Sequence, residues 1–407
     1  MQQDLIPHLF RTEFGRITAV LCKLFGLSNV ALAEDITSET FLAALNTWPY
    51  KGVPENPQAW LYTVAKNKVK NLLARDKLFN EKISPAFKSR LPPSEEMQPD
   101  LSTQNITDSQ LQMLFAICHP SIPPEAQIGL ALRILCGFGI EEIAGAFLRN
   151  KETINKRLFR AREKLRTANV KIELPPVNEI SNRLQTVLTT LYLLFNEGYY
   201  SETDNSVLRQ DLCFEAMRLV QMLLDHPPTN TPQVNALLAL MCFHASRFKA
   251  RKNSKGEAIL YEDQDESLWD GELIAKGAYH LNAASQGNSL SRYHLEAGIA
   301  YWHTIKTDTP AKWENILQFY NHLLAMEYSP VAALNRTYAL SKVHGAEAAI
   351  VEAEKLDLGN NHFYHTLLGE LYSDIDIEKA AEHLKQALKL AKTVADKQTI
   401  YRKIESL

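Results

Sequence analysis

Apolar residues recur along most of this chain every three or four positions, which is the spacing of amphipathic helices. Residues 5–25 follow this period, and Gly26 supplies a helix stop. A second helix is expected over about 28–48, and Asn56 with Pro57 can cap and begin a third. No segment has the alternation typical of a strand. The pattern therefore predicts an all-α protein.

Breaks in this pattern divide the chain into parts. From about Lys82 to Thr107 the sequence is polar and rich in proline, which is typical of a linker. Pro175 and Pro176 mark a second break. We therefore predict two small helical domains at residues 1–80 and 108–172, separated by a linker at 81–107, and a helical extension at 175–407.

Two apolar stripes after the linker predict a pair of short helices. The first stripe contains Ile140, Ile143, Ala144 and Phe147, and the second contains Ile154, Leu158, Ala161 and Leu165. Between them lies a turn at 148–150, in which Asn150 can cap the second helix. Such a pair is a helix-turn-helix, and small Ala144 and Gly145 would let a partner helix approach closely.

Charge is distributed unevenly. The whole chain carries 44 basic and 47 acidic residues, yet residues 148–166 hold eight basic residues and two acids. Before Pro175 the net charge is +4, and after it the net charge is −7. A basic front half joined to an acidic back half predicts a polyanionic partner for the front half.

The second helix of the helix-turn-helix suits the DNA major groove. Lys151, Glu152 and Thr153 in its first turn could read base edges, and Arg157, Arg160 and Arg162 could neutralise phosphates. The alternative interpretation is a solvated helix face.

A second basic helix lies in the first domain. It carries five basic residues against one acid, and Trp60 and Tyr62 lie at its start. Aromatic rings beside cations can stack on unpaired bases, although Trp60 could equally belong to the core. Two basic helices on separate domains predict two separated contacts on one DNA.

Other classes of protein lack support in the sequence. The five cysteines form no C-x-x-C pair or metal-ligand cluster, so we expect reduced, mostly buried thiols and no metal. We find no signal peptide, no apolar run of membrane-spanning length, no phosphate-binding loop and no catalytic constellation. We therefore expect a cytoplasmic protein that is not an enzyme, needs no cofactor and does not contact a membrane.

Two motifs carry a family resemblance. "AEDITSETFLAALNTW", followed by "AWLYTVAKNKVKN", resembles the promoter-melting domain of extracytoplasmic-function sigma factors. "IEEIAGAFLRNKETINKRLFRAREKLR" resembles their promoter-binding domain. The motifs occur in the family's order. The resemblance implies an alternative sigma factor that binds the RNA polymerase core and directs it to promoter DNA.

The resemblance also assigns roles to residues. Asp35, Glu39 and Phe41 match the helix that docks on the polymerase core, although Ser38 stands where glutamine is frequent; a solvated face is the alternative. Residues 50–58 match a loop that captures a flipped base, or they form only a rigid turn. The expected DNA-binding residues are Asn56, Trp60, Tyr62, Lys66, Asn67, Lys70, Arg149, Lys151, Glu152, Thr153, Asn155, Lys156, Arg157 and Arg160.

The extension contains a weak repeat. Asn335 and Tyr338 recur as Gly369 and Tyr372, and both spacings are 34, the tetratricopeptide period. This predicts a helical superhelix with a concave groove, which a protein or peptide regulator could occupy. The competing hypothesis for the whole chain is a helix-turn-helix regulator with a helical-repeat sensing domain, but it leaves the first 80 residues unexplained.

Overall fold

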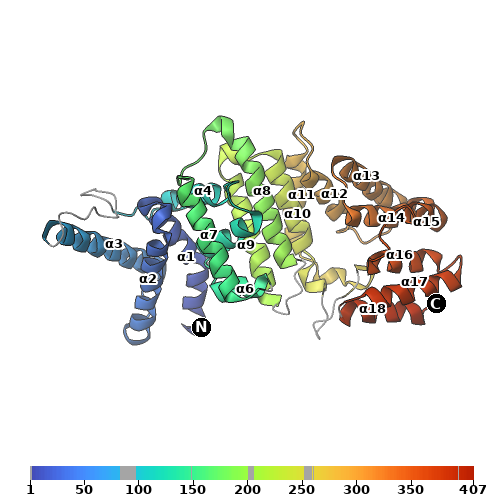
Figure 1. Cartoon of the computed structure of the whole chain (residues 1–407), viewed down its shortest axis with the longest axis horizontal. Helices are drawn as coiled ribbons and strands as arrows, with labels where there is room; N and C mark the ends of the chain where they lie inside the picture. Colours follow the sequence, from blue (N-terminus) through green and yellow to red (C-terminus); the bar gives the residue numbers. More distant parts are fainter. Residues whose placement is uncertain are drawn as a thin grey trace. The chain divides into compact units, whose positions relative to one another are not determined.

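The computed structural model of the chain describes residues 2–82, 98–147, 149–199, 206–251, 259, 261–392 and 394–407. Within these ranges the regular structure is helical and contains no β-strand, which confirms the all-α prediction (Figure 1). The chain divides into two compact units, Met1–Asn230 and Thr231–Leu407. Most of the predicted linker, including the acids Glu95 and Glu96, lies outside the described residues.

The first unit contains nine α-helices and a short π-helical turn, η2, among its described residues. They are α1 (Gln2–Phe25), α2 (Val30–Lys51), α3 (Pro57–Lys82), α4 (Thr103–Ile117), α5 (Pro124–Leu130), η2 (Ala131–Leu135), α6 (Ile140–Ala146), α7 (Lys151–Thr167), α8 (Val177–Tyr199) and α9 (Ser206–Leu224).

Local sequence signals set several of these helix ends. Gly26 follows α1 with φ of 81°, a left-handed conformation that glycine adopts without strain. The Asn56 side chain accepts a hydrogen bond from the Ala59 amide at 2.9 Å, and Asn150 accepts one from Thr153 at 2.7 Å. Both asparagines therefore cap the first turn of a helix, as predicted.

Other helix ends differ from the sequence prediction. Helix α2 begins at Val30, after a single 3₁₀ turn, and continues through Pro49 to Lys51. Pro49 lies in the last turn of α2, and Gly52, with φ of 83°, ends the helix. Helix α4 begins at Thr103 instead of 108, since Ser102 accepts a hydrogen bond from the Asn105 amide and caps it.

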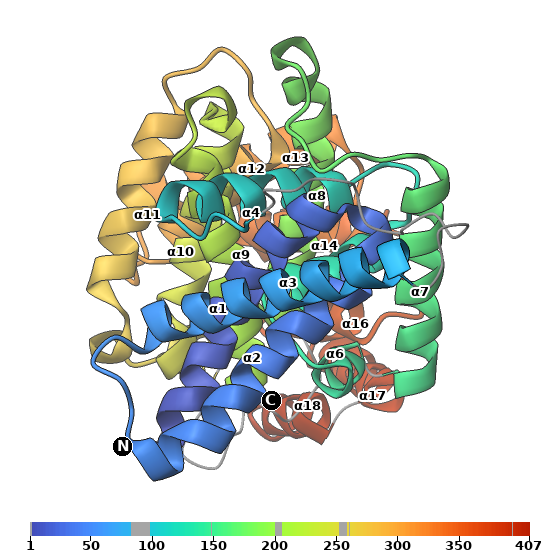
Figure 2. The same ribbon diagram turned by 90° about the vertical axis from the view of Figure 1, so that its left-hand side faces the viewer.

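Helix α1 lies at the centre of the first unit. It packs against α2, α4 and η2, and α3 runs across the side that α1 and α2 form (Figure 2). A Cβ added to Gly15 of α1 would lie 2.0 Å from the carbonyl oxygen of Leu135 in η2. Only glycine allows α1 to approach the second small domain this closely.

Helices α8 and α9 pack against the second small domain and belong to the first unit. The Arg183 guanidinium donates to the carbonyl of Phe115 at 2.7 Å, and Arg218 donates to the carbonyl of Leu135 at 3.2 Å. The buried Thr190 hydroxyl donates to the side-chain oxygen of Gln127 at 2.7 Å. These contacts join the start of the extension to the helices before it.

The second unit is a series of helices in which each α-helix packs against the next one or two. They are α10 (Pro232–Ala245), α11 (Gly271–Ala284), α12 (Arg292–Trp302), α13 (Pro310–Met326), α14 (Pro330–His344), α15 (Ala346–Ala353), α16 (His362–Tyr372), α17 (Ile377–Leu390) and α18 (Val394–Glu405). Packing between neighbours along the chain is typical of helical repeats.

Small residues let the helices of this series approach one another. A Cβ on Gly369 of α16 would lie 2.6 Å from Leu384 in α17, and Ala380 and Ala387 of α17 are fully buried. Small side chains at these positions allow α16 and α17 to pack closely. The repeat members Asn335 and Tyr338 lie on α14, and Gly369 and Tyr372 lie on α16.

All five cysteines are buried, as predicted, and none of them forms a disulfide bond. Burial raises the pKa of Cys118 and of Cys242 to about 12, so both thiols are protonated near neutral pH.

Candidate nucleic-acid interface

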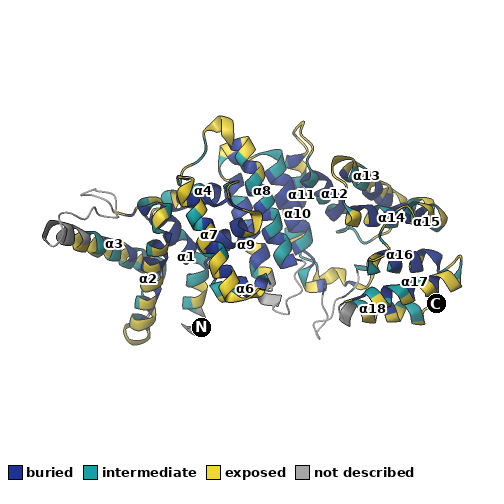
Figure 3. Cartoon of the chain, viewed as in Figure 1, coloured by how far each residue is buried: buried dark blue, intermediate teal, exposed yellow. Residues whose placement is uncertain are grey.

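Helix α2 presents a mixed acidic and apolar face. Asp35 and Glu39 are both exposed, and Glu39 forms an ion pair of 2.8 Å with Lys68 of α3. Leu42 and Leu45, one and two turns further along, expose 54% and 52% of their surface. Figure 3 shows exposed positions along α2. Sequence reasoning missed these two leucines, because an apolar residue in an amphipathic helix is normally assigned to the core.

Phe41 does not contribute its ring to this face. It is 3% exposed and packs edge-on against Phe10 of α1, with ring centroids 4.9 Å apart. The structure therefore places Phe41 in the core between α1 and α2, where it orients the helix that carries Asp35 and Glu39.

The last turn of α2 and the first turn of α3 place aromatic side chains next to the basic helix. Trp60 is half-buried and packs edge-on against the buried Trp48, with ring centroids 5.4 Å apart. Tyr50, in the last turn of α2, is 88% exposed, which makes it the aromatic ring in this region most available for stacking. The sequence pattern places Tyr50 at the start of the 50–58 segment but does not single it out.

Tyr62 is held by a polar network between α1 and α3. Its hydroxyl donates to Glu13 at 2.6 Å and accepts from Gln58 at 2.8 Å. Burial and the hydrogen bond to Glu13 raise the Tyr62 pKa to about 12, so the phenol stays protonated. The structure gives this side chain a role in packing α1 against α3.

The remaining predicted residues of α3 form an exposed basic face. Leu61, Ala65 and Val69 bury the opposite side of the helix completely. Lys66, Asn67 and Lys70 project into solvent from one side, within a turn and a half of one another. A solvent-facing row of cations with this spacing can follow a phosphate backbone.

Helix α7 presents the predicted recognition residues. Ile154, Leu158, Ala161 and Leu165 are buried, which confirms the predicted stripe. Arg157 is half-buried, and the other predicted residues are exposed: Arg149, Lys151, Glu152, Thr153, Asn155, Lys156 and Arg160. The close approach expected at Gly145 is wrong, because a Cβ there would meet no atom within 4 Å.

Two lysines of this face form exposed ion pairs. Lys151 lies 2.7 Å from Glu141, and Lys156 lies 3.1 Å from Glu152. Exposed pairs contribute only about 0–1 kcal/mol each, so a phosphate can replace either carboxylate at small cost.

Arg162 lies elsewhere than the sequence suggested. Its guanidinium donates to Glu34 of α2 at 2.8 Å, and Arg133 of η2 donates to the same carboxylate oxygen at 3.2 Å. We call this three-residue group the Glu34 ion cluster. It joins the first small domain to the second, and Arg162 is therefore engaged within the protein instead of facing a phosphate.

A second ionic contact joins the same two domains. Arg11 of α1 lies 2.7 Å from Glu142 of α6, and its guanidinium covers the Phe138 ring at 4.0 Å. Cationic and aromatic groups at this distance attract one another. The two basic helices α3 and α7 are thus carried by domains that contact each other in the first unit.

Metal binding and membrane insertion find no support in the described ranges. There, no group of three or more His, Cys, Asp or Glu side chains could hold a metal ion. None of the described helices combines the length and the apolar character that crossing a bilayer requires.

Two known protein families match segments of this chain. Residues 9–78, which contain most of α1, all of α2 and most of α3, match the family described as Sigma-70 region 2. Residues 183–285 match a family of unknown function, DUF6596. An all-α sigma domain followed by this helical region defines an extracytoplasmic-function-like sigma factor with a C-terminal extension, and a sigma-factor-like role in transcription initiation follows.

The chain also has a relative that it matches over most of its length. It is 33% identical over 361 residues to "Uncharacterized protein R00370" of Rhizobium meliloti (strain 1021), a match that covers 85% of this chain and 83% of that protein. The chain belongs to the same family as this relative. No solved structure matches the chain significantly.

Proposed function

We propose that the chain is an alternative sigma factor that binds the RNA polymerase core through α2 and directs it to promoters through α3 and α7. The observation that carries the proposal is the pair of solvent-facing basic helices in one unit, of which α3 lies largely within the sigma-70 region 2 match. Because α7 is capped by Asn150 and buries a full apolar stripe, its first turn is held rigidly for contact with base edges.

Promoter opening in this proposal needs binding energy and no covalent chemistry. Unstacking a base costs a few kcal/mol, which contacts to the extruded base can offset. Exposed Tyr50 and half-buried Trp60 offer stacking surfaces, and Lys66 and Lys70 offer charge for the separated backbone. The C-terminal unit would then regulate the factor by binding a protein or peptide.

The competing hypothesis is a helix-turn-helix regulator that binds duplex DNA without polymerase. The sigma-70 region 2 match weighs against it, because such a regulator has no use for the exposed Asp35, Glu39, Leu42 and Leu45 face of α2. Run-off transcription by the full chain with core polymerase, on a library of upstream regions, distinguishes the two. Polymerase-independent DNA binding without specific transcripts would favour the regulator.

Charge reversal on α2 should weaken core binding. We expect Asp35→Arg combined with Glu39→Arg to reduce the affinity for core polymerase about tenfold or more, because like charges across an interface oppose binding. Fluorescence anisotropy of the labelled full chain, titrated with core enzyme, measures this. Glu125→Arg, at an exposed acid of α5, is the matched control and should bind as the wild type does. Equal affinities for all three chains would contradict the α2 assignment.

Neutralising α7 should weaken promoter recognition. Arg157→Ala and Arg160→Ala should each reduce promoter-specific transcripts and lower the dependence of DNA binding on salt by about one phosphate contact. The readouts are run-off transcription and holoenzyme binding at several salt concentrations. Arg402→Ala, at an exposed arginine of α18, is the control. An unchanged salt dependence in both α7 variants would remove α7 from the DNA interface.

A further inference from the structure

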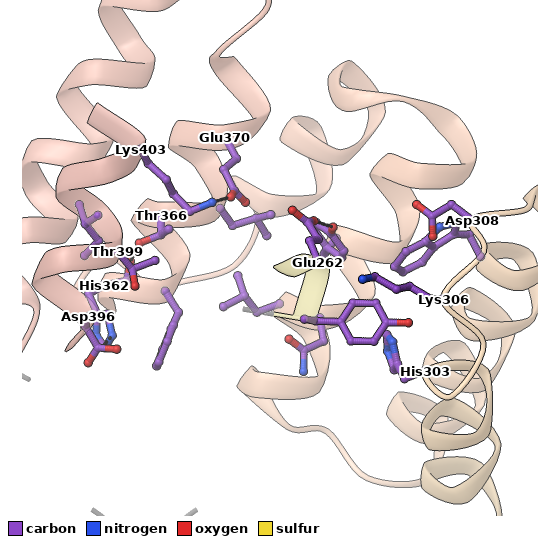
Figure 4. A pocket seen from close by; sticks show the side chains of 18 of the residues that line it. Glu262, His303, Lys306, Asp308, His362, Thr366, Glu370, Asp396, Thr399 and Lys403 are labelled. Carbon is purple, nitrogen blue, oxygen red and sulfur yellow. Dashed lines mark hydrogen bonds and ion pairs between the residues drawn. The ribbon is translucent and has the colours of Figure 1, made fainter. Parts of the chain in front are cut away.

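A large cavity lies wholly within the second unit. Its volume is about 830 Å³, and its walls come from α14, α16 and α18, the 3₁₀ turn at Tyr261–Asp263 and the segment that follows α12 (Figure 4). Ligand-binding pockets commonly have volumes of roughly 300–1,000 Å³. Neither the sigma-factor role nor the family match gives this cavity a ligand.

Three helices present the same kinds of residue to the cavity. Leu334, Leu367 and Ile400 line it from α14, α16 and α18, and successive members are 33 residues apart. Thr366 and Thr399 repeat at the same interval. A wall with apolar and hydrogen-bonding groups in rows suits an elongated ligand that carries such groups at intervals. An extended polypeptide has this character.

Two of the residues that line the cavity carry polar atoms without a hydrogen bond. Trp313 Nε1 and His362 Nε2 are buried and make no hydrogen bond within the described part of the chain. His362 Nε2 lies 3.6 Å from the Asp396 carboxylate, which is too far for a hydrogen bond. A buried indole N–H without an acceptor is costly, and a carbonyl oxygen of a ligand would satisfy it.

Most charged side chains of the cavity already have a hydrogen-bond or ion-pair partner. Asp308 lies 3.3 Å from Lys312, and Glu262 accepts a hydrogen bond from the Tyr338 hydroxyl. Lys403 bonds to Glu370, and Lys306 donates to the backbone carbonyl of Gln264. Figure 4 shows Asp396 and His362 towards one end of the cavity, and Lys306 and Asp308 towards the other.

The imidazole of His303 adds no charge to this cavity. Burial, reinforced by the nearby cations Arg247 and Lys312, lowers the His303 pKa to about 3, so the ring is neutral. With most of its charged side chains engaged within the protein and this ring neutral, the cavity favours an uncharged ligand.

One exposed aromatic ring offers a contact for an apolar side chain. Phe363 of α16 is 57% exposed, although it lines the cavity and packs against His362 with ring centroids 3.9 Å apart. A large ring left in solvent beside a cavity gains surface burial when a ligand covers it.

We propose that this cavity binds an extended, uncharged polypeptide segment of a partner protein, with apolar side chains against Phe363 and Leu367 and a backbone carbonyl on Trp313 Nε1. The inference rests on the proposed function, because it makes that segment the regulator of the sigma factor. The binding step itself is tested without polymerase.

The test is calorimetric titration of the full chain with a synthetic library. The probes are acetylated and amidated decapeptides with Leu, Val or Phe at alternating central positions and Ser, Thr or Gly elsewhere, and the comparison set carries Lys or Glu at the central positions. We expect micromolar binding of uncharged members and at least about tenfold weaker binding of charged ones. Phe363→Ala should weaken binding about tenfold, and Trp313→Phe should weaken it while retaining the ring.

Tyr401→Ala is the matched control, because Tyr401 is an exposed aromatic residue of α18 outside the cavity lining. Binding that Phe363→Ala leaves unchanged, or that Tyr401→Ala abolishes equally, would overturn the proposal. The proposal would also be overturned if dodecanoate, an apolar probe without amide groups, bound to the chain and none of the peptides did. Absence of any peptide binding overturns it as well, whereas failure of the wild-type chain to support transcription overturns only the sigma-factor role.

Discussion

Replacing Glu34 with alanine is expected to lower the free energy of unfolding of the first unit by about 3 kcal/mol, since removing one partner of a buried ion pair leaves the others uncompensated. The Glu34 side chain is 9% exposed, and its partners Arg133 and Arg162 are 20% and 25% exposed. Urea unfolding followed by circular dichroism measures the loss, and hydrogen exchange should show faster exchange in α2 and α7. Because the chain contains two compact units, the unfolding transition of the first unit must be analysed separately from that of the second.

Glu39→Ala is the control for this prediction. Glu39 lies on the same helix and pairs with Lys68 at 2.8 Å, but its side chain is 62% exposed. An exposed pair of this kind contributes about 0–1 kcal/mol. If the two alanine variants unfold at the same urea concentration, the Glu34 ion cluster does not stabilise the contact between the two small domains.

Gly15→Ala should lower the free energy of unfolding almost as much as Glu34→Ala, although alanine normally favours a helix more than glycine does. The added Cβ would lie 2.0 Å from the Leu135 carbonyl oxygen and 2.5 Å from its carbon, which are backbone atoms that no rotamer change can move. Helix α1 and η2 must separate, and overpacking of this kind costs about 1–3 kcal/mol or more. Alanine's helix propensity returns only about 1 kcal/mol. Thermal unfolding measures the net loss of stability.

At Gly145 the same substitution, glycine to alanine, is expected to have the opposite effect on stability. Gly145 lies in α6, is exposed, and would place its Cβ in open space. Alanine there should stabilise the chain by up to about 1 kcal/mol, because the helix propensity acts without a clash. A lower melting temperature for Gly145→Ala than for Gly15→Ala would refute the assigned cause.

The features that the sequence predicted correctly are those that local chemistry determines. Gly26 ends α1, Asn56 and Asn150 cap α3 and α7, and the stripe from Ile154 to Leu165 is buried as its spacing required. Each signal lies within a few residues of the structure that it specifies, so a single sequence suffices to read it.

The features that the sequence did not reveal depend on partners far along the chain. Glu34 lies in an acidic stretch whose pattern is typical of a solvent-exposed helix face. Its ion-pair partners Arg133 and Arg162 are 99 and 128 residues away along the chain. Phe41 turns inward to Phe10, and Leu42 and Leu45 turn outward, although all three are apolar residues of one helix. No local pattern distinguishes such neighbours, because tertiary packing selects which side of α2 is covered.

The hydrogen bonds that α8 and α9 make to Phe115, Gln127 and Leu135 bear on how the protein can be divided. If the chain ended at Pro175 and Pro176, these groups would lose their hydrogen-bond partners, and an apolar side of α4 and α5 would become exposed. The peptide bond after Asn230, where the first compact unit ends, is the better place for a cut when the front portion is produced alone.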